Sequence, residues 1–596
     1  MKKGILKYLV IAIAVLFVLP AGAYFGGQHG VATEGMGGRT ASPNSVTYIN
    51  PNTIPPNNTI QVSPPPRTPD VTPITYTIAH DFVTTKGNLH DYTYLNITLP
   101  STPWQAVILN YEGHSVGQVY DTRAWMSVNS VAVFRDICAE AGWYNVSANL
   151  TQYEPLFHGP VTIYFSPPAD AIVGFYESNV TISFYPGAAP TGLPNEIIPV
   201  IPLHQLYMNP KSNQTSYTVN LTVPSDAIAA VAQVWITSSG FDEFWYTLEP
   251  SYRAVELFSG SSQIANILPF YKVRTGGIDL FAWRPVTSPF ELNDRPYNVN
   301  VTAALGLLEH NTNLTISAVG MSPFGGYWIF RVNLLVWTST DVTGASSTGY
   351  MFKAGSPTIS TDIAMPGIGT ASTQSYFFEQ NSSAFSYSSR INTSTGPIFV
   401  SRSTTELSVM DQYSVNAVWE NLSGYQLTNT VMRTVYAQAG HQGTVLQTKT
   451  SYFAIQLQSG FVFSVTQTTN GGFPMYGPFA QYLNNMSITY DITHTYLSVS
   501  ASGIVRGESV LSNDLYTNGD LFAGVIELTS PVAGIISSIT AVQGTTMKTY
   551  TSLIYGSQDG RLVLESVYQH TIEAVSNNPP GPLYFGTIVL DEIYTF

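Results

Sequence analysis

Cysteine is almost absent from this sequence, since its 596 residues contain a single one, Cys138. An intramolecular disulfide is therefore excluded, and the fold must be stabilised by buried apolar surface. Charge is scarce as well: only 10% of the residues are Asp, Glu, Lys or Arg, and the net charge is −14. This balance argues against nucleic acid as a partner, because nucleic-acid binding needs a basic surface. It argues equally against binding to an acidic lipid surface.

Signatures of cofactor sites are missing too. No group of His, Cys, Asp and Glu residues has the spacing of a metal site, and the sequence contains no phosphate-binding loop or dinucleotide fingerprint. We therefore expect neither a metal nor an organic cofactor. Cys138 lacks the Cys–His context of a thiol nucleophile, so we expect it to be a small buried residue.

Long apolar runs are missing except at the N-terminus. Lys2 and Lys3 precede an apolar run from Tyr8 to Ala23 that ends in Pro-Ala-Gly-Ala. This pattern over residues 1–23 is typical of a secretory signal peptide, and an uncleaved run would be just long enough for an N-terminal membrane anchor. Both interpretations export the rest of the chain, so we expect an extracellular or cell-surface protein. In a glycosylating organism, sequons such as Asn96 would then carry glycans.

Residues typical of strands and turns are abundant. Tyr, Ser, Thr, Asn, Val and Ile are frequent, and period-two alternation recurs at short intervals without a long amphipathic helix. We predict an all-β protein with two packed jelly-roll or β-sandwich domains followed by a third β-rich C-terminal region. The predicted order is the segment 1–23, a Gly/Pro/Asn-rich spacer over 24–73, the first sandwich over 74–186, the second over 187–340, and the C-terminal region over 341–596. Strands expected in the first sandwich include 128–135, 172–176 and 180–185.

The C-terminal region over 341–596 carries no chemical motif. Its Ser, Thr, Tyr and Gly residues alternate in long predicted strands, among them 444–457 and 487–500. An accessory β-domain and a sugar-binding region are both compatible with this composition.

Two stretches combine carboxylates, cations and flat aromatic rings. The first is QVYDTRAW and the residues that follow it, over 118–157, and the second lies between Phe241 and Trp337. The second contains the segments FDEFWY, TGGIDLFAWRPV and GYWIFRVNLLVW. A protein that holds a sugar beside an amide or glycosidic bond needs such groups. A sandwich core with aromatic residues and a structural Arg–Glu pair would have the same pattern.

Read together, these segments resemble the peptide-N-glycosidase A family, plant and fungal enzymes that cleave N-linked glycans from asparagine. The resemblance covers residues 100–340, and six of its blocks stand in the family's order: Asp242–Tyr246, Tyr252–Val255, Thr275–Ile278, Trp283–Val286, Leu305–Leu308 and Tyr327–Trp337. The first stretch departs from the family pattern. Thr122 stands where the family has Arg, Arg123 follows one place later, and Ala141 replaces a Pro.

The resemblance implies a hydrolase that cleaves the glycosylated asparagine amide of glycoproteins or glycopeptides, releases the glycan as a glycosylamine and leaves Asp. It implies three catalytic acids: Asp121, Glu140 and Glu243. It implies six substrate-binding residues: Arg123, Trp125, Arg135, Trp245, Trp283 and Arg284. Asp121 would orient or deprotonate water, and the other two acids would hold the first sugar and assist proton transfer. The arginines would pair with the acids or polarise the carbonyl, and the tryptophans would wall the sugar.

Each of these residues has a structural alternative. Asp121 could accept backbone hydrogen bonds in a turn, Arg135 and Glu140 could form an ion pair, and each tryptophan could be core. Two other functions also fit the sequence. One is a non-catalytic cell-surface protein that binds glycans or builds an envelope layer, and the other is a glycoside hydrolase that uses two of the same carboxylates. The oligomeric state is left open.

Overall fold

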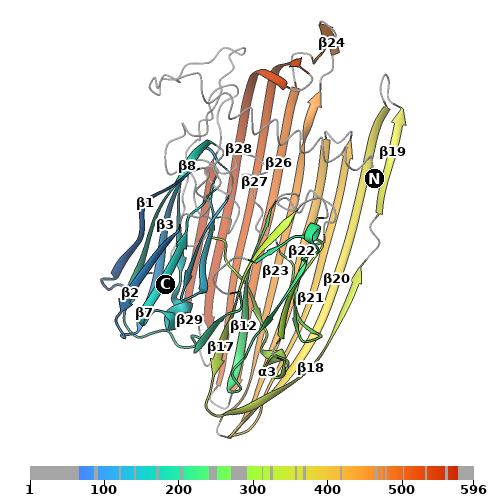
Figure 1. Ribbon diagram of the computed structural model, residues 1–596. Coiled ribbons are helices and arrows are strands. Elements are labelled where there is room, and N and C mark those ends of the chain that lie inside the picture. The colour runs from blue at the N-terminus through green and yellow to red at the C-terminus, as the bar shows by residue number, and fades with distance from the viewer. Residues whose placement is uncertain are drawn as a thin grey trace.

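The computed structural model describes residues 66–574 apart from the following positions: 67, 86–91, 120–121, 140–141, 170–172, 202–205, 240–251, 270–291, 312, 323–325, 356–358, 367–370, 416–418, 440, 464–466, 471–472, 477–479, 501–502, 531–532 and 557–561. Over these residues the chain is built almost entirely of antiparallel strands in five sheets (Figure 1). The predicted all-β class is confirmed.

The first unit is an eight-stranded jelly roll. Its two sheets have the strand orders β1-β8-β3-β6 and β2-β7-β4-β5. The strands are β1 (Ile74–Thr85), β2 (Thr93–Leu99), β3 (Trp104–Gln118), β4 (Arg123–Val128), β5 (Val131–Ile137), β6 (Gly142–Asn149), β7 (Gly159–Ser166) and β8 (Val173–Pro186). A 3-10 helix, η2 (Thr151–Leu156), joins β6 to β7. Apolar residues alternate into the space between the sheets and form a continuous core.

Two strand predictions in this unit were wrong in detail. The predicted strand 128–135 contains a hairpin turn, because Asn129 and Ser130 adopt φ values of 47° and 72°. Two consecutive left-handed residues match the twist of a tight hairpin, and Asn tolerates this conformation well. The predicted strands 172–176 and 180–185 form one strand, β8, because its pairing with β3 continues through the polar residues between them.

The second unit repeats the jelly-roll topology, with the sheets β10-β17-β12-β15 and β11-β16-β13-β14. Its strands are β9 (Glu196–Pro199), β10 (Leu206–Met208), β11 (Ser216–Asn220), β12 (Ala227–Ser239), β13 (Ala254–Ser259), β14 (Ser262–Ile267), β15 (Tyr297–Asn300), β16 (Asn313–Val319) and β17 (Tyr327–Thr338). Short helices are η3 (Pro210–Ser212), η6 (Thr302–Ala304) and α3 (Leu305–His310). Among the described residues, no helix has the length and apolar character needed to cross a membrane.

The C-terminal region is one long twelve-stranded sheet, which Figure 1 shows as the tall yellow-to-red ribbon. Its strands are β18 (Val342–Gly355), β19 (Ile359–Pro366), β20 (Ala371–Thr393), β21 (Ile398–Val415), β22 (Trp419–Gln438), β23 (His441–Phe463), β24 (Gln467–Asn470), β25 (Phe473–Tyr476), β26 (Ala480–Ser500), β27 (Gly503–Ser530), β28 (Ala533–Gly556) and β29 (Leu562–Ala574). Hairpin neighbours pair in sequence order from β20 to β23, so this sheet is largely a meander.

The second jelly roll shares its hydrophobic packing with both other units. Trp235 and Leu335 project from its β12 and β17 into the core of the first jelly roll. On its other side, Val255 and Leu257 of β13 belong to one cluster with Phe385 of the long sheet. The long sheet is therefore part of the packed structure of the second roll.

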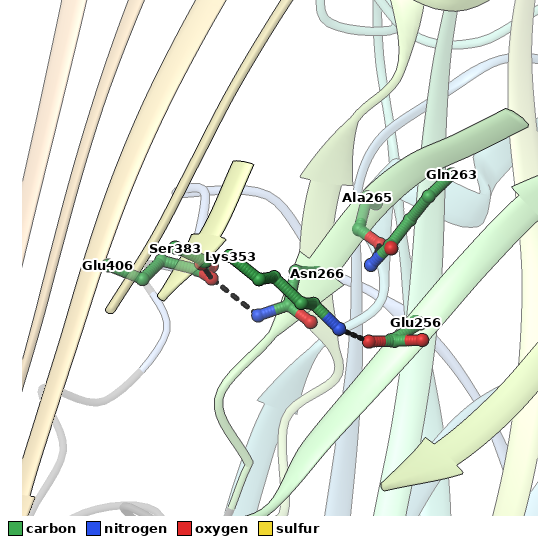
Figure 2. A network of polar contacts seen from close by, with 7 residues as sticks. All are labelled: Glu256, Gln263, Ala265, Asn266, Lys353, Ser383 and Glu406. Atoms are coloured by element: carbon green, nitrogen blue, oxygen red, sulfur yellow. Dashed lines mark hydrogen bonds and ion pairs between the residues drawn. The ribbon is translucent and has the colours of Figure 1, made fainter. Parts of the chain in front are cut away.

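A polar network adds to this contact with the long sheet (Figure 2). Lys353 of β18 forms an ion pair with Glu256 of β13, and Asn266 of β14 donates a hydrogen bond to Glu406 of β21. Ser383 of β20 also donates to the Glu406 carboxylate. Burial raises the pKa of Glu406, an effect that these hydrogen bonds oppose. Five strands from two units thus contribute polar groups to this contact.

Candidate active site at the junction of the two jelly rolls

The two chain segments that contain the predicted acids Asp121 and Glu140 start from one end of the first jelly roll. At this end Gln118 is paired with Val173, Ser115 with Gly142 and Arg123 with Ile137. Just beyond the last pair, the amide of Cys138 donates to the carbonyl of Thr122 at 2.8 Å. Thr122 directly follows the segment 120–121, and Cys138 lies two residues before the segment 140–141.

Asp121 and Glu140 themselves lie outside the described residues. The strands on either side of their two segments are nevertheless adjacent, because β4 and β5 are hydrogen-bonded partners. The topology of the first roll therefore starts both segments from the same edge.

The second jelly roll has the same arrangement at one of its ends. There Ser239 is paired with Tyr327, and Ala254 with Val319. The segment 240–251 connects β12 to β13, and the segment 270–291 lies between β14 and β15. Four predicted site residues fall in these two segments and therefore lie outside the described residues: Glu243, Trp245, Trp283 and Arg284.

These two ends meet where β5 of the first roll contacts the segment that leads into β15. The amide of Ile137 donates to the carbonyl of Leu292 at 3.4 Å, and the amide of Asp294 donates to the carbonyl of Arg135 at 3.1 Å. Asp136 and Asn293 form an isolated antiparallel bridge between these contacts. Both sets of connections therefore begin beside a single junction.

Arg135, a predicted substrate-binding residue, forms a buried ion pair across this junction. Its guanidinium contacts the carboxylate of Asp294, and the two side chains are 2% and 1% exposed. Burial lowers the pKa of Arg135, and the Asp294 carboxylate opposes that effect. The sequence suggested Glu140 as the acid for this arginine, whereas the described partner is Asp294. Trp235 Nε1 donates to the Asp294 backbone carbonyl at 3.0 Å, which fixes the same segment.

Trp125 is cross-strand partner to Arg135 and lies on the same face of the sheet. The guanidinium carbon of Arg331, from β17 of the second roll, lies 4.1 Å from the centre of the Trp125 ring. This cation–π contact leaves the Trp125 side chain 6% exposed. Arg123, two residues before Trp125, is half-buried and lowers the pKa of Arg135 further. The three predicted substrate-binding residues that the structure describes, Arg123, Trp125 and Arg135, thus lie on one face of the sheet at the junction.

Arg331 was not among the predicted site residues. It is buried, and its Nη1 donates to the carbonyl of Ile201 at 3.3 Å. Burial lowers its pKa to about 10, so the side chain is still a cation at neutral pH. A single arginine within the apolar strand YWIFRVNLLVW was the available signal. An isolated charge among buried apolar residues is expected only where a partner or a function retains it.

Asp136 is a further acid that the sequence interpretation missed. Its side chain is fully buried inside the first roll, and Tyr144 donates a hydrogen bond to its Oδ2 at 2.9 Å. The hydroxyl of Tyr111 lies 3.3 Å from that of Tyr144 and 3.2 Å from that of Ser178. Burial raises the pKa of Asp136 well above its usual value, the Tyr144 hydrogen bond opposes this shift, and Asp294 adds to it. The chain of hydroxyls therefore ends at a buried carboxyl whose pKa is raised.

Replacing Asp136 by Asn should stabilise the protein at pH 8. Because burial raises the pKa of Asp136 in the folded state, Asp136 lowers the free energy of unfolding progressively as the pH rises from about 4, the usual pKa of an unfolded Asp, toward its raised pKa. Asn keeps an acceptor for Tyr144 and removes this penalty, so the gain in the free energy of unfolding should be larger at pH 8 than at pH 4. Urea unfolding at pH 4 and pH 8 measures the effect. A variant that is no more stable than the parent at pH 8 would contradict this account.

The junction therefore combines three arginines, an indole ring and the Asp294 carboxylate in a largely buried setting. Within the described part of the chain, no group of His, Cys, Asp and Glu could hold a metal ion. Arg135, Arg331 and Trp125 are 2%, 2% and 6% exposed, and their contacts join the two rolls. Catalysis there would depend on acids supplied by the connecting segments.

Comparison with known proteins gives a family and several distant relatives. A family model described as Peptide N-acetyl-beta-D-glucosaminyl asparaginase amidase A matches residues 62–354. Peptide-N4-(N-acetyl-beta-glucosaminyl)asparagine amidase A of Prunus dulcis is 23% identical over 299 residues, a match that covers 42% of this chain. The match covers 52% of the Prunus dulcis protein, so this chain spans about half the length of that curated relative.

Two solved structures are also similar to parts of the chain. One is PNGase F, a glycosylasparaginase from Flavobacterium meningosepticum, with 12% identity and a TM-score of 0.32, covering 45% of this chain and 97% of that chain. The other is the major capsid protein P2 of bacteriophage PM2, with 10% identity and a TM-score of 0.21, covering 45% of this chain and 99% of that chain.

Proposed function

Because residues 62–354 form a domain of the peptide N-acetyl-beta-D-glucosaminyl asparaginase amidase A family, we propose that this chain is a peptide-N-glycosidase. It hydrolyses the glycosylated asparagine amide of a glycoprotein or glycopeptide, releases the glycan as a glycosylamine and leaves Asp. The observation that carries the proposal is the extent of the family match. It spans both jelly rolls and their junction, together with the segments that contain all the predicted acids.

The proposed reaction adds water to the amide carbonyl and expels the glycosylated nitrogen. Asp121 takes a proton from the attacking water as it adds, and Glu140 or Glu243 assists protonation of the leaving nitrogen. The bond between the carbonyl carbon and nitrogen then breaks, the water oxygen remains in the new Asp carboxyl, and the sugar leaves with the amine. Arg284 and Arg123 provide positive charge for the carbonyl oxygen as it becomes negative.

The buried groups at the junction hold this site together. Arg135 and Asp294 connect β5 to the described residues that lead into β15. Arg331 and Trp125 make a second contact between β17 and β4. We assign these residues to positioning the two halves of the site. The proposed location of the enzyme is outside the cell, with residues 1–23 as the export signal or anchor.

Mass spectrometry on a defined glycopeptide tests the proposed function. Amidase action should release the entire glycan and raise the peptide mass by about one unit, because Asn becomes Asp. In water enriched in ¹⁸O, the heavy oxygen should appear in the new Asp carboxyl. A glycoside hydrolase would leave a sugar on Asn and label the released sugar instead, and a non-catalytic binding protein would leave the glycopeptide unchanged. Either of these results would overturn the proposal.

A further inference from the structure

A row of tyrosines leads from the solvent to the junction of the two jelly rolls. Tyr92 and Tyr94 are 49% and 52% exposed, and their ring centroids lie 5.4 Å and 4.9 Å from that of Tyr164. Tyr164 in turn lies 4.7 Å from Trp125, which is 6% exposed. We call Tyr92, Tyr94 and Tyr164 the tyrosine row. Its rings are in continuous contact from open solvent to the ring that Arg331 covers.

The pairing of three strands places this row at the same end as the candidate site. Tyr94 of β2 is directly opposite Tyr164 of β7, and Tyr164 is directly opposite Ser127 of β4. Trp125 is two residues from Ser127 and therefore lies on the same face of the sheet. The alternate residues of β4, such as Met126, belong to the core of the roll. The tyrosine row therefore lies on the outer face, beside the start of β4.

The second roll contributes aromatic rings to the same side of the junction. Tyr207 of β10 and Tyr327 of β17 have ring centroids 6.0 Å apart, and Tyr207 is 50% exposed. Their neighbours Met208 and Trp328 point into the core of the second roll. By strand alternation, Tyr327 is on the same face of β17 as Arg331, which contacts Trp125. Exposed tyrosines thus occur on the junction-facing side of both rolls.

The chemistry of the row suits a neutral ligand with alternating apolar and hydroxyl surface. A tyrosine ring offers a flat apolar face, and its hydroxyl donates or accepts hydrogen bonds. Burial raises the pKa of Tyr164, so its ring is uncharged at neutral pH. The charged group that acts on it is Arg331, and its other neighbours are Tyr92, Tyr94 and the hydroxyl of Ser166. Sugar rings have the required combination of C–H faces and hydroxyl groups.

We propose that the tyrosine row is a carbohydrate subsite that binds the sugars of an N-glycan beyond the one attached to asparagine. This assignment rests on the proposed function for the direction of the glycan, since the linkage sugar would occupy the candidate active site. The row does not contact the reacting bond. It sets affinity for extended glycans and leaves the chemical step unchanged.

Binding of an isolated glycan tests the subsite without any catalysis. The probe is an intact N-glycan whose reducing end has been reduced to the alditol, so that no amide bond is present. Isothermal titration should show that Tyr92→Ala/Tyr94→Ala weakens binding about tenfold, because the two exposed ring faces of the row are lost. Tyr350→Ala is the matched control, because Tyr350 is 69% exposed on β18 of the long sheet. It should bind as the parent does, and Tyr94→Phe should keep most of the affinity.

Kinetics on two glycopeptides that share one peptide but differ in glycan length then test whether the subsite lies away from the scissile amide bond. For the complete glycan, the double variant should raise KM about tenfold with kcat unchanged. For the peptide that carries a single N-acetylglucosamine, both constants should match the parent. Unchanged alditol binding in the double variant would overturn the subsite, as would a KM that depends on peptide length and not on glycan length. An inactive parent that still shows the binding difference would reject the proposed function and keep the subsite.

Discussion

Replacing Asp121 by Asn should lower kcat for glycopeptide hydrolysis by about 10²- to 10⁴-fold, the contribution expected of a general base. Asn keeps the size and the hydrogen-bonding capacity of the side chain but cannot accept a proton from water. KM should stay within about twofold, because the lost interaction strengthens only in the transition state. Initial rates measured by mass spectrometry on one glycopeptide give both constants.

Cys138→Ala is the matched control for this experiment. The amide of Cys138 donates to the carbonyl of Thr122, one residue from Asp121, so both substitutions are made beside the same pair of strands. The Cys138 side chain is fully buried in the core of the first roll, away from solvent. We expect this variant to keep kcat within about threefold, because a thiol buried in an apolar core is not accessible as a nucleophile. Activity that survives in Asp121→Asn, or that disappears in Cys138→Ala, would reverse the assignment.

Replacing Asp294 by Ala should destabilise the protein by about 3–5 kcal/mol, the effect of leaving one partner of a buried ion pair uncompensated. Arg135 is 2% exposed and would remain at the junction without the carboxylate that it contacts. The backbone contacts of the segment, from Ile137 to Leu292 and from Asp294 to Arg135, would remain. Chemical denaturation at neutral pH, followed by tryptophan fluorescence, measures the change because Trp235 donates to the same residue's carbonyl.

A double variant separates the uncompensated charge from the loss of packing. Arg135→Met with Asp294→Leu removes both charges and fills similar volume, and such exchanges are often close to neutral. The double variant should therefore be more stable than Asp294→Ala alone. If the two variants were equally destabilised, the ion pair would contribute through its shape and not through its charge. The single variant should also lower activity, since the pair joins the two halves of the proposed site.

Much of the architecture could be predicted from the residue pattern. Alternation of apolar and polar residues over short segments indicated sandwiches, since a strand exposes its side chains to two faces in turn. The long C-terminal strands were predicted from the same pattern, although 444–457 proved to be the centre of a strand that runs from His441 to Phe463. The hairpin at Asn129 and Ser130 was missed because apolar residues surround it on both sides.

The sequence by itself determined the strand content, the scarcity of charge and the family blocks, because these depend on neighbouring residues. It could not determine which acid meets Arg135, since Asp294 is 159 positions away and every carboxylate in the second roll was an equal candidate. Nor could it bring Arg331 onto the ring of Trp125, or align the tyrosines of β2 and β7 into one row. Strand register and the packing of one roll against the other made those choices. Register and packing depend on the free energy of burying whole surfaces. That free energy cannot be read from the residues of any one short segment.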